Sequence, residues 1–218
     1  MKSQTITALF AIVLMTAVSS CKDKAKEAET SAAEEVAEAT VVSEKYMATP
    51  SSSTIEWKGF KPTGSHNGTI ALSSGEFTMS NGTIESGTFM IDMGSLVVLD
   101  IPAEDEGNGK LAGHLKGADF FDVEQYPNAT FEVTGMNETD GATMLSGNLT
   151  LKGVENNITI PVTVSETDNT VTLTSDVFTI DRSKWNVKYG SKSFFDDLGD
   201  RFINDDIELK INVMAKKA

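Results

Sequence analysis

Residues 113–127 read GHLKGADFFDVEQYP and form the least strand-like stretch of a chain that elsewhere alternates apolar and polar residues. Leu111 and Leu115 are four positions apart and Ala118 follows at three, so a short helix here presents one apolar stripe. Gly117 weakens that helix, and aromatic residues and a proline follow it beside a turn. The stretch therefore predicts a helix and an aromatic cluster that plug or cover one end of a closed sheet.

Strand patterns, with apolar residues at every second position, lie on both sides of this stretch. The clearest is the last one, where residues 207–213 alternate strictly. One pattern changes phase between Leu173 and Phe178, and a bulge around residues 175–177 would restore it. The predicted strands cover residues 54–59, 69–72, 76–79, 87–93, 130–133, 145–151, 158–164, 171–173, 178–180 and 207–213.

These strands predict an all-β fold, because nearly all have one apolar face and short turns such as Ser80-Asn81-Gly82 join many neighbours. An open sheet would leave its apolar face in water. Closure hides that face and removes the edges, and about eight strands enclose an interior that side chains or one small ligand can fill. A two-sheet sandwich satisfies the same pattern. We favour an antiparallel β-barrel of about eight strands with a short helical insertion.

The N-terminus has the pattern of an export signal. Lys2 precedes an uncharged, mostly apolar run, residues 6–18, which has signal-peptide length and is too short for an ordinary membrane span. Small residues then precede Cys21, the only cysteine of the chain, and this arrangement resembles the lipobox of bacterial lipoproteins. We therefore expect residues 1–20 to be a lipoprotein signal peptide and Cys21 to be acylated. The alternative is a secretory peptide cut nearby, with an incidental cysteine.

Residues 21–50 are rich in Lys, Glu, Ala, Thr and Ser and have few large apolar side chains, so we expect a disordered acidic tether. The folded domain then occupies residues 51–218. The net charge of −14 argues against a nucleic-acid partner and against electrostatic attraction to anionic lipid. Membrane attachment is therefore expected through acyl chains on Cys21 rather than through charge.

Five groups of residues occur in a fixed order along the chain and cover nearly all of residues 53–215. They are Trp57-Lys58-Gly59 with Lys61, His66 and Gly68; Gly87-Thr88-Phe89 with Ile91-Asp92-Met93 and Ser95; Leu111 with His114-Leu115-Lys116, Asp119-Phe120-Phe121-Asp122 and Tyr126-Pro127; Gly147-Asn148-Leu149-Thr150-Leu151-Lys152-Gly153; and Ile180-Asp181-Arg182 with Trp185 and Tyr189. In this order they resemble the YceI-like family of exported proteins. The third and fourth groups are the most specific.

The resemblance implies a lipocalin-like antiparallel barrel that binds a polyisoprenoid or a similar amphiphilic lipid, such as an isoprenoid or fatty-acid-like molecule, in a long apolar tunnel. Residues 61–68 depart from the Lys-His-Leu-Gly-like run of the better-known members near this point.

The candidate ligand-binding residues are large apolar side chains of the predicted strands and of the helical insertion, with a histidine and a tryptophan from the family motifs. They are Trp57, Phe77, Phe89, Ile91, Met93, His114, Phe120, Phe121, Phe131, Leu149, Phe178 and Trp185. Side chains of this kind line apolar ligand pockets. Taken singly, each is better explained as core packing, because buried aromatic residues usually just pack.

No catalytic residue, metal site or cofactor is expected. His66 and His114 are the only histidines, lie far apart in sequence and have no metal-binding spacing. The aspartates of residues 196–206 lack the order and the closing glutamate of a calcium loop. Nucleophile elbows, phosphate loops and Cys/His clusters do not occur. A hydrolase or isomerase that uses His114 and Asp119 is the enzymatic alternative, and the spacing gives it little support.

We therefore expect an exported, membrane-anchored lipoprotein of the bacterial cell envelope, on its periplasmic side or at the cell surface. Its barrel interior would bind the lipid in order to carry or sequester it. The alternative is a non-enzymatic envelope stress or interaction module, whose barrel is filled by side chains and whose loops meet a protein partner. The sequence identifies no such partner.

Overall fold

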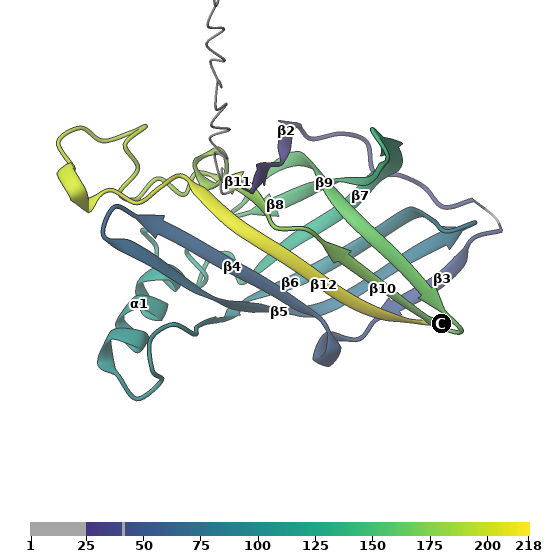
Figure 1. Ribbon diagram of the computed structural model, residues 1–218, viewed down its shortest axis with the longest axis horizontal. Coiled ribbons are helices and arrows are strands. Elements are labelled where there is room, and N and C mark those ends of the chain that lie inside the picture. The colour runs from purple at the N-terminus through teal and green to yellow at the C-terminus, as the bar shows by residue number, and fades with distance from the viewer. Residues whose placement is uncertain (1–24, 41) are drawn as a thin grey trace, which may run out of the picture.

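The computed structural model describes residues 25–40 and 42–218, and within these ranges twelve strands belong to one sheet (Figure 1). The strands are β1 (Lys26–Glu27), β2 (Glu29–Ala32), β3 (Glu44–Ala48), β4 (Thr54–Lys61), β5 (Gly64–Ser80), β6 (Thr83–Val98), β7 (Asn128–Thr139), β8 (Ala142–Leu151), β9 (Val154–Thr167), β10 (Thr170–Ser175), β11 (Phe178–Asp181) and β12 (Asp206–Lys217). The helices are α1 (Glu106–Lys116) and the short 3-10 helices η1 (Pro50–Ser52), η2 (Arg182–Trp185) and η3 (Gly199–Arg201).

The sheet closes on itself. Strands β4 to β10 pair antiparallel in chain order, and β12 pairs with β10 on one side and with β4 on the other. Ile211 of β12 stands opposite Ile55 of β4, which joins the last strand to the first of the ring. Eight of the described strands, β4 to β10 and β12, therefore form a barrel, as expected from the strand patterns.

Aromatic rings fill part of the barrel interior. Tyr46, Phe77, Phe89 and Phe131 follow one another, with ring centroids 5.5, 5.9 and 6.5 Å apart. Glycine on a neighbouring strand makes room for such a ring: a Cβ on Gly147 would lie 2.3 Å from the nearest Phe131 ring atom. Large rings and facing glycines thus let the strands close tightly around a packed core.

The predicted helix is present as α1, which lies at one end of the barrel and ends at Lys116, so that Ala118 of the expected stripe lies beyond it (Figure 1). Asp105 caps its first turn, because the carboxylate accepts a hydrogen bond from the Gly107 N–H over 2.7 Å. Gly117 ends the helix, and its N–H donates to the carbonyl oxygen of His114. Leu111 and Leu115 pack against the hydrophobic core, so the short apolar stripe holds the helix against the barrel.

The expected bulge lies between β10 and β11, which both pair with β12. Thr174 is opposite Asn212, and Phe178 is opposite Leu209. Between these two pairs, the chain from β10 to β11 has three residues, 175–177, whereas β12 has two, 210 and 211. This extra residue restores the inward phase of Phe178, which is buried.

The segment before the barrel differs from the expected disordered tether of residues 21–50. From Ala25 onward it contains β1, which pairs with β11, β2, which pairs with β9, and β3, which pairs with both β5 and β12. Backbone pairing requires no apolar side chains, and for this reason composition gave no sign of it. The expectation is therefore corrected for the described residues of this segment.

Two buried side chains and an amide also attach the segment to the barrel. Ala28 and Tyr46 are buried in the core. Asn148 of β8 accepts a hydrogen bond from the Glu34 N–H over 3.0 Å and donates one to the Glu34 carbonyl oxygen over 2.7 Å. Residues 1–20 and Cys21, which were assigned to a signal peptide and a lipid anchor, lie outside the described residues.

Candidate functional site

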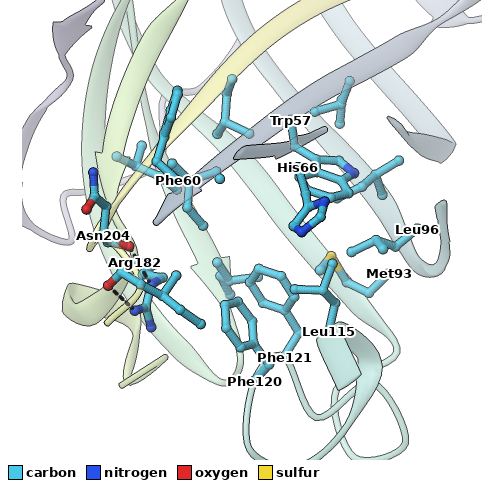
Figure 2. A pocket seen from close by; sticks show the side chains of 18 of the residues that line it. Trp57, Phe60, His66, Met93, Leu96, Leu115, Phe120, Phe121, Arg182 and Asn204 are labelled. Atoms are coloured by element: carbon cyan, nitrogen blue, oxygen red, sulfur yellow. Dashed lines mark hydrogen bonds between the residues drawn. The ribbon is translucent and has the colours of Figure 1, made fainter. Parts of the chain in front are cut away.

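A cavity of about 340 Å³ lies inside the barrel at the end that carries α1 (Figure 2). Strands β4, β5, β6, β7, β8, β11 and β12 contribute side chains to its wall, and α1 and the Phe120–Phe121 pair close one side. Phe120 and Phe121 are buried, and their rings meet edge to face, with centroids 5.1 Å apart. The wall is mainly apolar, as ligand pockets are.

A second, smaller cavity of about 90 Å³ lies among β4 to β12. Ile55, Ile91, Leu149 and Leu209 line both spaces, so these four side chains lie between the two cavities. The lining of the smaller cavity is apolar apart from Ser175, whose hydroxyl accepts a hydrogen bond from the Ile211 N–H. The interior therefore contains two adjoining apolar cavities.

Polar side chains occur at the α1 end of the larger cavity. Lys61, Arg201 and Asn204 belong to its lining and are exposed to solvent, as expected at an opening. His66, also in the lining, is half-buried, and Figure 2 shows its ring between Trp57 and Phe121. An amphiphile could therefore place a polar group here and its apolar part inside.

The His66 ring is held by Asp100. Its Nδ1 lies 2.8 Å from Asp100 Oδ2, and Asp100 Oδ1 accepts a hydrogen bond from the Asn67 N–H over 2.9 Å. Partial burial raises the pKa of the Asp100 carboxyl group, but the Asn67 N–H and His66 outweigh it, so the pKa lies below its ordinary value. Asp100 therefore stays ionised and directs Nδ1 of the ring toward itself, which leaves Nε2 as the nitrogen available to a ligand.

Arg182 forms a charged but fully buried part of the wall, and Figure 2 shows it across the cavity from His66. Its guanidinium group donates to the carbonyl oxygens of Val187, Ile203 and Asn204 over 2.5, 3.1 and 3.1 Å. Burial lowers the pKa of Arg182, and the nearby carboxylates of Asp205 and Asp181 oppose that shift. The Phe120 ring centroid lies 5.2 Å from the guanidinium carbon.

Trp57 is the largest side chain on the β4 side of the cavity and is 8% exposed. Its Nε1–H is buried and has no hydrogen-bond acceptor among the described residues. The opposite residue, Gly68, must be a glycine, because a Cβ there would lie 1.8 Å from the Val97 carbonyl oxygen and 2.9 Å from the indole. The glycine lets the indole lie flat against β5.

The structure brings together most of the ligand-binding residues predicted from the sequence. Those that line the larger cavity are Trp57, Ile91, Met93, His114, Phe120, Phe121 and Leu149, and those that line the smaller one are Phe89, Ile91, Phe131, Leu149 and Phe178. Their contact with a ligand stays a prediction. Phe77 and Trp185 line neither cavity, which corrects their assignment to the lining.

Phe77 and Trp185 are instead packing residues. Phe77 is buried between the rings of Tyr46 and Phe89. Trp185 is fully buried, and its Nε1–H donates to the Leu149 carbonyl oxygen. His114 makes ring contacts at the cavity wall, edge to face with Tyr189 at 4.6 Å and with Phe120 at 6.0 Å between centroids.

Several lining residues were not among the candidates. Ile55, Ile207 and Leu209 could have been found, because strand alternation places them on the inward face with Trp57. Arg201 ends η3, and Ile203 and Asn204 lie between η3 and β12; no sequence pattern indicated that this part of the chain returns to the barrel end.

Among residues 25–40 and 42–218, no helix is long and apolar enough to cross a membrane. In the same ranges, no three side chains of the His, Cys, Asp or Glu type come together as a group that could hold a metal ion.

Comparison with known proteins gives one family and several related folds. The YceI-like domain family matches residues 46–215. A UPF0312 protein of Yersinia pestis is 34% identical over 64 residues, which cover 29% of this chain and 33% of that protein. A UPF0312 protein of Azotobacter vinelandii is 37% identical over 65 residues, which cover 29% and 34%. The matches thus span about a third of the length of these relatives.

Two solved structures share the fold along most of their length. BcnA of Burkholderia cenocepacia superposes with a TM-score of 0.60 and 24% identity, over 78% of this chain and 99% of that one. A polyisoprenoid-binding domain from Saccharophagus degradans, implicated in plant cell wall breakdown, superposes with a TM-score of 0.56 and 14% identity, over 79% and 98%. At these identities the similarity shows the fold alone.

Proposed function

This chain belongs to the YceI-like domain family, as its motifs indicated, and on that premise we propose that it binds an amphiphilic lipid in the interior of its barrel. The observation that carries the proposal is the pair of adjoining apolar cavities, with Lys61, His66 and Arg201 gathered at the α1 end. The polyisoprenoid-binding domain of S. degradans, which shares the fold, supports the same class of ligand.

The arrangement of polar and apolar side chains orients the ligand. Its apolar chain lies along Ile91 and Leu149 and points toward the smaller cavity. Its polar group stays at the α1 end, where the His66 imidazole and the solvent-exposed cations of Lys61 and Arg201 meet it. An oxygen-bearing head group, such as a hydroxyl, phosphate or carboxylate, matches these side chains.

The cavity volume sets the size of the buried part. The larger cavity, at about 340 Å³, lies at the lower end of the range of about 300–1,000 Å³ that is usual for small-molecule pockets, and the smaller one adds about 90 Å³. A long polyisoprenoid would therefore extend out of the α1 end or require the barrel to widen.

The envelope role is part of the same proposal. The apolar run before Cys21 and the single cysteine support an exported lipoprotein that is anchored to a membrane through acyl chains and that carries or sequesters its lipid. Mass spectrometry of the protein purified from a bacterial host, with and without Cys21→Ser, tests the anchor. The acyl mass is expected only on the chain that retains Cys21.

Native mass spectrometry of residues 22–218, which contain the whole described barrel, tests lipid binding. The protein is exported, purified without detergent and then extracted with organic solvent. We expect a bound species of defined mass. A protein that stays empty, also after incubation with isoprenoids and fatty acids, contradicts lipid binding and favours the interaction module.

A cavity-filling variant locates the bound species. Ala129 of β7 lines the larger cavity and is buried, so Ala129→Phe occupies part of that space. Ala71 of β5 is exposed, and Ala71→Phe is the matched control. We expect the bound mass to be lost only in Ala129→Phe, and Ala129→Leu provides a milder change if the larger side chain prevents folding. Equal binding by all variants would place the ligand elsewhere.

A further inference from the structure

A loop with exposed aromatic side chains projects from the same end of the barrel as the cavity opening. We call it the aromatic loop, residues 189–202, and Figure 1 shows it in yellow-green, extending beyond the strands on the side of α1. Tyr189, Phe194 and Phe195 are 44%, 48% and 50% exposed. Adjacent phenylalanines that are half exposed lie in contact with water at an energetic cost, so their position requires an explanation.

The aromatic loop has a defined structure that holds these rings outward. The Ser191 hydroxyl is buried and donates to Asp205 Oδ2 over 2.9 Å. The N–H groups of Phe194 and Phe195 both donate to the Ser191 carbonyl oxygen, over 3.2 and 3.0 Å. The Gly190 carbonyl oxygen accepts a hydrogen bond from the Ile203 N–H over 2.8 Å, and this bond joins the two ends of the loop. The backbone thus presents both phenyl rings to the outside.

Lysine side chains lie over two rings of the same loop region. The Lys188 ammonium group is 4.6 Å from the Phe194 ring centroid, and that of Lys192 is 3.6 Å from the Phe202 ring centroid. At the boundary between lipid tails and head groups, membrane-bound proteins often combine aromatic rings with lysines whose aliphatic stems lie along apolar surface. In that combination the rings enter the apolar layer and the ammonium groups reach the lipid phosphates.

The charge of this region differs from that of the whole chain. Between residues 188 and 202, three cations, Lys188, Lys192 and Arg201, balance three aspartates, at positions 196, 197 and 200. The chain as a whole carries −14. The aromatic loop itself carries −1, and with Lys188 just before it the stretch 188–202 is neutral on an acidic protein, so an anionic head-group layer repels it less than it repels a strongly acidic face.

The aromatic loop also borders the cavity. Arg201 at its end lines the larger cavity, and Ile203 and Asn204, which follow directly, line it too. Tyr189 contacts His114, another lining residue. A surface that dips into a bilayer here would bring the opening against the lipid, so that an apolar chain could pass between the two without crossing water.

We propose that the aromatic loop is a docking surface for a lipid bilayer, which it enters through Phe194 and Phe195. The proposal rests on the proposed lipid-binding function, because only that function explains why the loop borders the opening. A lipid surface fits better than a folded partner, since the neighbouring cavity already takes apolar chains and the lysines lie over the rings.

Vesicle sedimentation of residues 22–218, which lack the acylation site, tests the docking surface. The vesicles are phosphatidylcholine alone, and phosphatidylcholine with phosphatidylglycerol. We expect binding to both, and a loss of at least about tenfold in affinity for Phe194→Ser/Phe195→Ser, because two phenyl rings no longer enter the apolar layer. The matched control is Met47→Ser/Val177→Ser, two side chains that are each 43% exposed and belong to other parts of the surface.

Uptake of a soluble short-chain fluorescent fatty acid, measured without vesicles, separates the two proposals. The Phe194→Ser/Phe195→Ser variant is expected to keep this uptake while it loses the vesicles. Vesicle binding that this variant retains, or that the control loses equally, overturns the docking surface and leaves the cavity intact as a site. A third outcome is that no variant takes up the fatty acid although vesicle binding depends on the two phenylalanines. This outcome would contradict the lipid-binding function and the link between loop and cavity.

Discussion

The Nε1–H of Trp185 donates a hydrogen bond over 2.8 Å to the carbonyl oxygen of Leu149, a residue whose side chain lines both interior cavities. Trp185 belongs to η2, after β11, and Leu149 to β8, so this bond joins two distant segments of the chain. The fully buried indole therefore supports the cavity wall from behind rather than forming it.

Trp185→Phe is expected to lower the free energy of unfolding by about 2–4 kcal/mol, because it removes a buried hydrogen bond and leaves unfilled volume. Urea denaturation measures the change. Trp57→Phe is the matched control, since the Trp57 Nε1–H has no described acceptor to lose. We expect the control to change stability by less than about 1.5 kcal/mol. A larger loss in the control than in Trp185→Phe would contradict the supporting role.

Arg182→Met is expected to lower the free energy of unfolding by about 3–5 kcal/mol, because it leaves three backbone carbonyl groups and Asp205 without their buried cation. Arg182→Lys keeps the charge but not the planar fork, so we expect a loss of intermediate size. Thermal unfolding followed by circular dichroism compares the two. If the Met variant matched the natural chain in stability, the guanidinium group would have no structural role.

The strand patterns were sufficient to predict the barrel, because inward and outward positions alternate along most of β4 to β12, although the β5–β6 and β7–β8 pairings contain register shifts that the patterns did not indicate. Even the bulge at residues 175–177 could be placed, since only an extra residue brings Phe178 back to the inside. The helix could also be predicted, from the spacing of Leu111 and Leu115. What these signals share is that each depends on local side-chain periodicity.

The features that sequence analysis missed depend on the backbone or on long-range packing. Strands β1 to β3 pair through backbone N–H and C=O groups, so the polar composition of this segment did not indicate that it forms strands. Phe77 and Trp185 are aromatic like the lining residues, and only the closed barrel decides which rings face the cavity. Conversely, the exposed Arg201 and Asn204 reach the cavity through a loop with no periodic pattern.

Asn148→Ala is expected to release the segment around β2 while the barrel stays folded. The Asn148 amide is buried, holds Glu34 through two hydrogen bonds and accepts a third from Asn157 over 3.0 Å. Hydrogen exchange followed by mass spectrometry should show faster exchange in residues 29–37 and little change in β5 to β7. Asn128→Ala, an exposed change on β7, is the control. Unchanged exchange around Glu34 would show that β2 is held by strand pairing alone.

Tyr46 links stability to alkaline pH. Its hydroxyl donates to Glu166 over 2.7 Å, and this bond, with burial and the negative charge of Glu166, raises the pKa of Tyr46 well above its ordinary value. The folded-state pKa is thus higher than the unfolded one of about 10, so the stabilisation is fully present below pH 10 and is lost as the pH rises above it.

Tyr46→Phe should therefore have two effects on the free energy of unfolding. Below pH 9 it lowers the value by about 1–2 kcal/mol, because the hydrogen bond to a carboxylate is lost. Above pH 10 the natural chain loses stability by up to about 1.4 kcal/mol per pH unit more steeply than the variant, because Tyr46 releases its proton in the unfolded state while the folded state retains it. Urea denaturation at pH 8, 9, 10.5 and 11 measures both effects.

The exposed Tyr189, changed to phenylalanine, serves as control and should keep the natural slope. If Tyr46→Phe also kept that slope, the alkaline loss of stability would arise from other groups, such as lysines, that are common to both proteins.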